Sequence, residues 1–91
     1  MLIRYFIIKN KLGLHARPAA RLAELASKFD AEIKIDKNNV KADAKSIVDL
    51  LHLACQFGGK IRLEISGKDA EVAVSAISKW IEEELGDLTT N

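Results

Sequence analysis

The sequence has little of several residue types, and each shortage excludes a class of protein. Cys55 is the only cysteine among the 91 residues, so the chain forms no internal disulfide and is not a disulfide-stabilised secreted scaffold. Aromatic residues make up 5% of the chain, which is too few for a surface on which nucleic-acid bases stack. No apolar run approaches the roughly 18 residues of a membrane-spanning helix, so we expect no membrane insertion.

An excess of charge of one sign is also lacking. The 14 basic and 13 acidic residues leave a net charge of +1, so no overall positive field attracts nucleic acid. The apolar run Tyr5–Ile8 is too short for the core of a signal peptide, and no small-residue cleavage site follows it. We therefore expect a cytoplasmic protein that binds no nucleic acid.

The composition that is present favours a small globular protein. Hydrophobic residues make up 48% of the chain and charged residues 30%, which is typical of a folded soluble domain and not of a disordered tail. The length suits one domain, and no repeat or low-complexity linker divides the chain. We expect residues 1–91 to form a single domain and the protein to be a monomer.

Hydrophobic periodicity predicts strands and helices that alternate along the chain. The predicted strands are Leu2–Ile8, Glu32–Asp36, a weaker strand around Val40 and Ala42, and Lys60–Ser66. The predicted helices are Ala16–Phe29, Ile47–Leu53 and Ala70–Leu85, with Gly86 as the residue that ends the last helix.

The resulting order, βαββαβα, predicts an α+β fold. Strands that alternate apolar and polar residues give a sheet with one dry and one wet face, and three amphipathic helices suffice to cover the dry face only. We therefore expect an open-faced β-sandwich, with a four-stranded, mostly antiparallel sheet and three helices on one face. The nearest alternative is a ferredoxin-like split βαβ fold, which lacks the short helix that begins at Ile47.

One segment combines several residues that suit anion chemistry at a predicted helix start. Gly13 permits a sharp turn, His15 comes directly before the helix, and Pro18 falls in the first turn, where a missing N–H is tolerated. The backbone N–H groups of Ala16 and Arg17 have no acceptor within the helix. Together with the helix dipole they favour an anion beside the imidazole.

The same positive field disfavours the imidazolium form of His15, and a neutral imidazole has a lone pair with which it can act as a nucleophile. The guanidinium of Arg17 can hold phosphate oxygens with its forked geometry. These residues together indicate a histidine that accepts a phosphoryl group. The alternative is that His15 has no chemical role, because a histidine near a helix start is most often a surface residue or a weak cap.

The chain resembles the HPr family, the histidine-containing phosphocarriers of the phosphoenolpyruvate-dependent sugar phosphotransferase system. The family's active-site signature matches Gly13-Leu14-His15-Ala16-Arg17-Pro18-Ala19, and a second family block matches Lys45-Ser46-Ile47. The likeness extends over nearly the whole chain in length and in the order of its elements.

The resemblance implies a relay and not an independent enzyme. His15 matches the residue that accepts a phosphoryl group at Nδ1 from phosphorylated Enzyme I and passes it to EIIA domains during sugar uptake and phosphorylation. Arg17 matches the residue that steadies the phosphate, and the free N–H groups of Ala16 and Arg17 are expected to bind it as well. The resemblance implies no cofactor and no metal ion, and no thiolate or carboxylate joins His15 and His52 at the spacing of metal ligands.

Ser46 has a structural role and, by resemblance, a regulatory one. It precedes a predicted helix with Asp49 three residues later, which is the pattern of a helix cap. In some relatives the matching serine is phosphorylated by HPr kinase/phosphorylase, which would then be a further partner. The resemblance also makes Ile47, Val48 and Leu51 a docking patch. We assign Leu50, Leu53 and Cys55 to the interior.

Two departures from the sugar-type pattern leave the pathway open. Leu12 replaces a small polar residue near the histidine, and Asp49 places negative charge beside Ser46. The run from Asn10 to Gly13 resembles NPr, the nitrogen-type branch of the family, as much as it resembles the sugar-type HPr. The alternatives are therefore a regulatory carrier not coupled to sugar transport and an interaction module switched at Ser46. The sequence names neither the sugar nor the partners.

Overall fold

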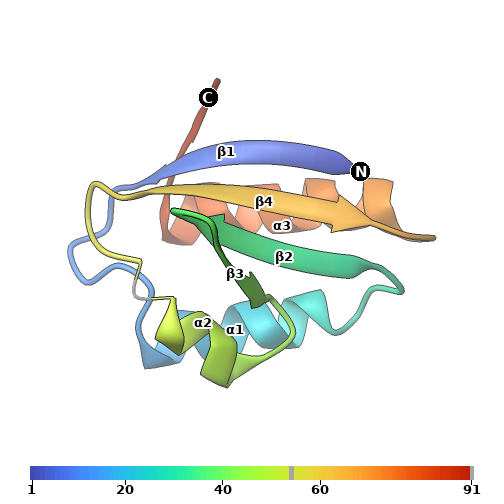
Figure 1. Ribbon diagram of the computed structural model, residues 1–91, viewed down its shortest axis with the longest axis horizontal. Helices are drawn as coiled ribbons and strands as arrows, with labels where there is room; N and C mark the ends of the chain where they lie inside the picture. The colour runs from blue at the N-terminus through green and yellow to red at the C-terminus, as the bar shows by residue number, and fades with distance from the viewer. Residues whose placement is uncertain (54, 91) are drawn as a thin grey trace.

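The computed structural model describes residues 1–53 and 55–90, and the predicted order of elements is confirmed within them (Figure 1). The elements are β1 (Leu2–Ile8), α1 (Ala16–Ala26), β2 (Glu32–Lys37), β3 (Val40–Asp43), α2 (Ile47–His52), β4 (Lys60–Ser66), α3 (Ala70–Glu84) and β5 (Gly86–Thr89). The last strand is an addition to the prediction.

The described strands form one five-stranded sheet in the order β3-β2-β4-β1-β5. Each pairing between them is antiparallel. The central strand β4 lies between β1 and β2, with Ile61 opposite Phe6 and Ile65 opposite Ile33. The predicted α+β open-faced sandwich is confirmed, and the predicted sheet of four strands is corrected to five.

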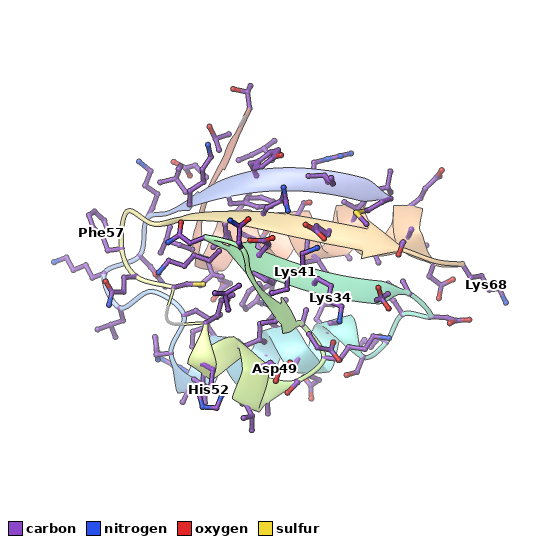
Figure 2. The ribbon with its side chains drawn as sticks, in the orientation of Figure 1. Lys34, Lys41, Asp49, His52, Phe57 and Lys68 are labelled. Atoms are coloured by element: carbon purple, nitrogen blue, oxygen red, sulfur yellow. The ribbon has the colours of Figure 1, made fainter. Side chains whose placement is uncertain are left out.

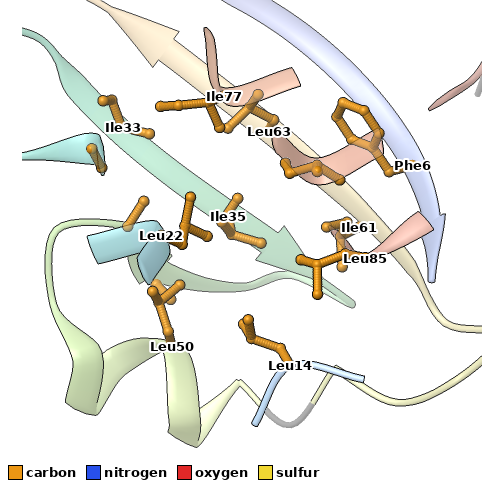
Figure 3. Packing of buried hydrophobic residues seen from close by; sticks show 14 of the residues in the cluster. Phe6, Leu14, Leu22, Ile33, Ile35, Leu50, Ile61, Leu63, Ile77 and Leu85 are labelled. Carbon is orange, nitrogen blue, oxygen red and sulfur yellow. The ribbon is translucent and has the colours of Figure 1, made fainter. Parts of the chain in front are cut away.

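The three helices cover one face of the sheet, as predicted (Figure 1). Alternate residues of the strands point toward the helices and are buried, and Figure 3 shows them meeting side chains from α1, α2 and α3. The core residues of the central strands are Phe6, Ile8, Ile33, Ile35, Ile61, Leu63 and Ile65. The helices contribute Leu22 from α1, Leu50 from α2 and Ile77 from α3. The predicted burial of Leu50 and Leu53 is also confirmed.

The other face of the sheet is open and charged. Asp36 and Glu64 are both buried there, and Arg62 contacts each of them, at 2.9 Å and 2.7 Å. Lys41 in β3 contacts Glu64 in β4 at 3.1 Å. Figure 2 shows Lys41 together with Lys34 of β2, the strand that lies between β3 and β4. The partly exposed side chains of Lys41 and Arg62 thus pair with the two buried carboxylates on the face that the helices leave open.

Gly86 directly follows Leu85, the C-terminal cap of α3, as predicted, and it also begins β5. The glycine is not in the left-handed conformation of a helix-ending residue. Its need is steric instead, since a Cβ at this position would overlap the carbonyl oxygen of Ile7 in the paired strand. The strand was missed because Gly86–Thr89 has one large apolar residue, Leu88, which is 50% exposed, so the segment shows no apolar alternation.

The helices are also shorter than predicted at their C-terminal ends. α1 ends at Ala26 and not at Phe29, because the N–H groups of Lys28 and Phe29 donate to carbonyls three residues back and tighten the chain into a turn. α2 and α3 each end one residue early, with Leu53 and Leu85 as their C-terminal caps.

Candidate functional site

The loop that leads into α1 is held against the segment before β4. Gly13 has a φ of +65°, and a Cβ there would overlap the carbonyl oxygen of Cys55. The next residue, Leu14, donates its N–H to that same oxygen at 2.9 Å. The sharp turn expected at Gly13 is therefore present, and glycine is required both for its backbone conformation and for the close approach.

His15 is the N-terminal cap residue of α1. Its backbone is extended, with φ −110° and ψ −169°, and its carbonyl accepts the N–H of Ala19 at 2.9 Å. None of the described side chains caps this end, and the first turn has no acidic residue. The N–H groups of Ala16 and Arg17 therefore stay available at the positive end of the helix, and Pro18 adds none.

His15 and Arg17 line the same cavity, which has a volume of about 230 Å³. The remaining lining residues are Asn10, Pro18, Arg21 and Glu84. The sequence analysis missed Arg21, although it follows Arg17 by four residues and so shares its face of the helix. It also missed Asn10 and Glu84, because their place beside His15 depends on how α3 ends and not on any local pattern.

The C-terminal end of α3 docks on the loop that precedes His15. The carbonyl oxygen of Leu85 accepts the N–H groups of Lys9 and Asn10, at 2.7 Å and 3.1 Å. The side-chain amide of Asn10 donates to the carbonyl of Glu84 at 3.2 Å. Carbonyls at the end of a helix lack partners within it, so this loop supplies the missing donors and joins the end of α3 to the start of α1.

Ser46 caps α2, as predicted. Its Oγ accepts the N–H of Asp49 at 3.2 Å. The Asp49 carboxylate does not return a bond to the cap residue, because it accepts the N–H of Asp43 at 3.1 Å. Both groups are thus engaged in holding the start of α2 to the end of β3.

The predicted docking residues are exposed, by 43% for Ile47, 62% for Val48 and 42% for Leu51. Ile47 and Val48 line a groove of about 510 Å³ between α1 and α2. The other residues of this groove are Ala20, Ala23, Glu24, Ser27, Lys45 and Ser46. The structure therefore places Ser46 and His15 in separate depressions along the same helix, α1.

Two further residues have no part in these depressions. His52 is exposed on α2, where Figure 2 shows it pointing away from the sheet. Cys55 is buried, and burial raises the pKa of its thiol from 9.0 to about 11, opposed by the positive charge of Lys37. Within residues 1–53 and 55–90, no three metal-ligating side chains cluster together.

Among the described helices, none is both long enough and apolar enough to span a membrane.

Comparison with known proteins identifies the same family as the sequence motifs. The family model described as "PTS HPr component phosphorylation site" matches residues 3–83. The phosphocarrier protein HPr of Cupriavidus necator is 40% identical over 87 residues, which are 96% of this chain and 98% of that protein. The phosphocarrier protein NPr of Shewanella violacea is 48% identical over 79 residues, which are 87% of each.

The fold matches as well as the sequence. A crystal structure of HPr from Thermoanaerobacter tengcongensis superimposes with a TM-score of 0.86 at 42% identity, over 91% of this chain and 93% of that one. The match of the family model and the extent of these likenesses establish the relationship. The chain belongs to the HPr/NPr family of phosphocarrier proteins.

Proposed function

We propose that the chain accepts a phosphoryl group on Nδ1 of His15 from phosphorylated Enzyme I and passes it to EIIA domains in sugar uptake. The observation that carries this proposal is the cavity that His15 shares with Arg17 at the uncapped start of α1. A nucleophile, a guanidinium and free backbone N–H groups meet there. Phosphoryl transfer needs little more than positioning and charge stabilisation, which such a set can supply.

The transfer step exchanges one bond to phosphorus for another. The Nδ1 lone pair of His15 attacks the phosphorus of the donor, and the bond from phosphorus to the donor atom breaks with its electrons left on that atom. The phosphoryl oxygens lie against Arg17 and the N–H groups of Ala16 and Arg17, whose positive character matches the charge that arrives. The proton on the far ring nitrogen stays in place, and transfer to an EIIA domain reverses the sequence.

A phosphorus NMR spectrum tests this proposal. The chain is incubated with phosphoenolpyruvate, Mg²⁺ and Enzyme I, and an acid-labile phosphohistidine signal is expected. The signal should be absent in His15→Ala and retained in His52→Ala, which removes the other histidine of the chain. A phosphohistidine that survives in His15→Ala, or none in the wild-type chain with any Enzyme I, would contradict the proposal.

A second candidate is a nitrogen-type carrier that regulates targets without moving sugar. Leu12 favours it, because the residue is 74% exposed three positions before His15 and its side chain has no hydrogen-bond donor for a phosphate. The identity of 48% to an NPr also supports it. Phosphorylation rates with a sugar-type and a nitrogen-type Enzyme I decide between the two, since the physiological donor should be faster by an order of magnitude or more.

We also propose that Ser46 regulates docking on Ile47, Val48 and Leu51. A phosphate on Ser46 would lie in the groove between α1 and α2, beside two of these apolar residues, and its charge of about −2 would change what binds there. Ser46→Asp should weaken association with Enzyme I, whereas Ser75→Asp places the same charge on the exposed face of α3 and should not. Equal affinities for the two variants would contradict this role. HPr kinase/phosphorylase is the proposed modifying partner.

The proposal further includes a cytoplasmic location and a monomeric state. A relay that meets two partners in turn needs its site free of other copies of itself. Size-exclusion chromatography coupled to light scattering should give a mass near 10.0 kDa, and twice that mass would contradict the monomer.

A further inference from the structure

We infer that Asn10 is the positioning residue for His15, because it fastens the loop that carries the histidine to the end of α3. Its side-chain amide donates two hydrogen bonds, both of 3.2 Å, to the carbonyl of Gly13 and to the carbonyl of Glu84. Gly13 lies two residues before His15, and Glu84 is the last residue of α3. One side chain thus spans the two parts of the chain that meet at the cavity.

The backbone of the same loop reinforces this connection. The N–H of Asn10 donates to the carbonyl of Leu85 at 3.1 Å, and the N–H of Gly13 donates to the carbonyl of Asn10 at 3.4 Å. Asn10 therefore bonds both backbone groups of Gly13 and the carbonyls of Glu84 and Leu85 at the end of α3. If the amide is lost, the backbone bonds to Leu85 and between Gly13 and Asn10 remain, but the carbonyl of Gly13, on the side that leads into α1, loses the donor of Asn10.

The Asn10 side chain is oriented by its two N–H donors and not by its oxygen. Oδ1 of Asn10 is buried and has no hydrogen-bond partner among the described residues. The amide cannot be turned over, because Oδ1 would then face two carbonyl oxygens. A buried acceptor without a partner is unfavourable, and such groups in native proteins call for an explanation. Here the oxygen is left unpaired while the amide hydrogens bond both the loop and the end of α3.

The position of this loop matters because Asn10 and His15 line one cavity. The start of α1 is fixed on one side by the N–H of Leu14, which donates to Cys55. Asn10 fixes the other side, toward α3. A displacement of about 1 Å at a reacting group can cost roughly 100-fold in rate, so a loop held on one side only should transfer phosphate more slowly.

The test replaces Asn10 by Leu, which has a similar branched shape but neither an amide hydrogen nor a charge that would repel a phosphate. The carbonyls of Gly13 and Glu84 would lose their donor, so Asn10→Leu should release the loop. Asn10→Ser keeps one donor and should fall between this variant and the wild-type chain. Asp69→Ala is the matched control, because it removes a hydrogen bond between a side chain and the backbone, Asp30 N–H to Asp69 Oδ2 at 2.7 Å, at the start of α3, the end of that helix away from Glu84.

Two measurements are made on each folded variant. The first is the NMR spectrum of the His15 ring in the unphosphorylated protein, which reports the position of the imidazole and does not depend on the proposed function. The second, which rests on the proposed function, is the rate of phosphohistidine formation with Enzyme I. Asn10→Leu should move the ring signals and lower the rate about 10- to 100-fold, and the control should do neither.

A purely structural role would give a different result. If Asn10→Leu lowers the urea midpoint while the His15 signals of the folded protein stay in place, the inference is wrong. It is also wrong if the signals move and the rate does not change. If the wild-type chain is not phosphorylated at all, the proposed function fails, and the ring signals alone then decide the inference.

Discussion

The two helices that begin at His15 and at Ser46 are prepared differently for an anion. At α2, Ser46 Oγ already accepts an N–H of the first turn, and Asp49 adds a negative charge there. At α1, His15 leaves the first turn without a side-chain cap or an acidic residue, and Arg17 lines the adjoining cavity. A phosphoryl group at His15 would meet free donors, whereas one at Ser46 would displace a cap and approach a carboxylate.

The difference shows that a helix N-terminus is not by itself an anion site. The helix dipole is common to both ends, but at α2 the chain satisfies its own donors and holds the helix start to Asp43. The start of α1 has no side-chain cap, and hydrogen bonds instead hold the loop before it to Cys55 and to the end of α3. The position of this uncapped helix start therefore depends on distant parts of the chain.

The largest expected effect comes from Gly13→Ala, because Gly13 lies in the loop that leads into the uncapped start of α1, here called the open end. A Cβ there would overlap the Cys55 carbonyl in a left-handed backbone. Left-handed strain and overpacking together should lower the free energy of unfolding by about 3 kcal/mol. Gly58→Ala is the control, because Gly58 has a φ of +81° but open space around its Cβ position. Urea denaturation should show the smaller loss, about 1 kcal/mol, for that variant, and equal losses would contradict the steric explanation.

Charge reversal at the open end should come next. Arg17→Glu replaces a group that attracts phosphate by one that repels it, in the cavity that His15 lines. The rate of phosphohistidine formation should fall about 100-fold, as it does when one charge-stabilising group is removed from an active site. Lys28→Glu makes the same change of charge beyond the far end of α1 and should leave the rate within a factor of about two. Unchanged kinetics for Arg17→Glu would remove the residue from the proposed site.

The thiol of Cys55 tests the burial of the segment that holds the loop before His15, since the carbonyl of Cys55 accepts the N–H of Leu14. Because burial raises its pKa from 9.0 to about 11, the thiolate forms more readily in the unfolded chain. The contribution of this group to stability is therefore complete below pH 9 and is lost as the pH rises toward 11. At pH 10 the loss should be about 1 kcal/mol. Urea denaturation from pH 8 to pH 10 should show this decline, and Cys55→Ala should lack that part of it; parallel curves would contradict the raised pKa.

The smallest effect is expected at the closed end. Ser46→Ala removes the cap of α2 and should cost about 1 kcal/mol of stability. It should leave the rate of phosphohistidine formation at saturating Enzyme I unchanged, because Ser46 and His15 lie in different depressions along α1. A slower rate in a variant that is still fully folded would show that the two helix starts are coupled and that the comparison overstates their independence.

Much of this arrangement could be predicted from the sequence because it is local. The apolar alternation of Lys60–Ser66 and the helical spacing of Ala70–Leu85 record which face of each element is buried. The coincidence of Gly13, His15 and Pro18 marks a turn and a helix start. The Ser46 cap is likewise visible from the spacing to Asp49.

The rest depends on contacts between distant residues. Asn10 and Glu84 are 74 positions apart, so no local pattern brings them to one cavity. The Asp49 carboxylate turns to Asp43 and not back to its own cap, because β3 ends beside it. β5 lacks an apolar face and pairs only along the edge of β1, so the alternation that predicts the other strands is missing from it.

The position of β1 in the sheet has a consequence for the order in which the protein can fold during synthesis. β1 precedes the other strands, yet its neighbours in the sheet are β4 and β5, which a ribosome adds only after α1, β2, β3 and α2. Pairing between strands so far apart must wait for both to emerge, whereas α1 and the β2-β3 hairpin need only nearby residues. Since β1 leads directly into the loop before His15, a nascent chain would not hold its histidine in place. The site would form only after β4 and β5 have been synthesised.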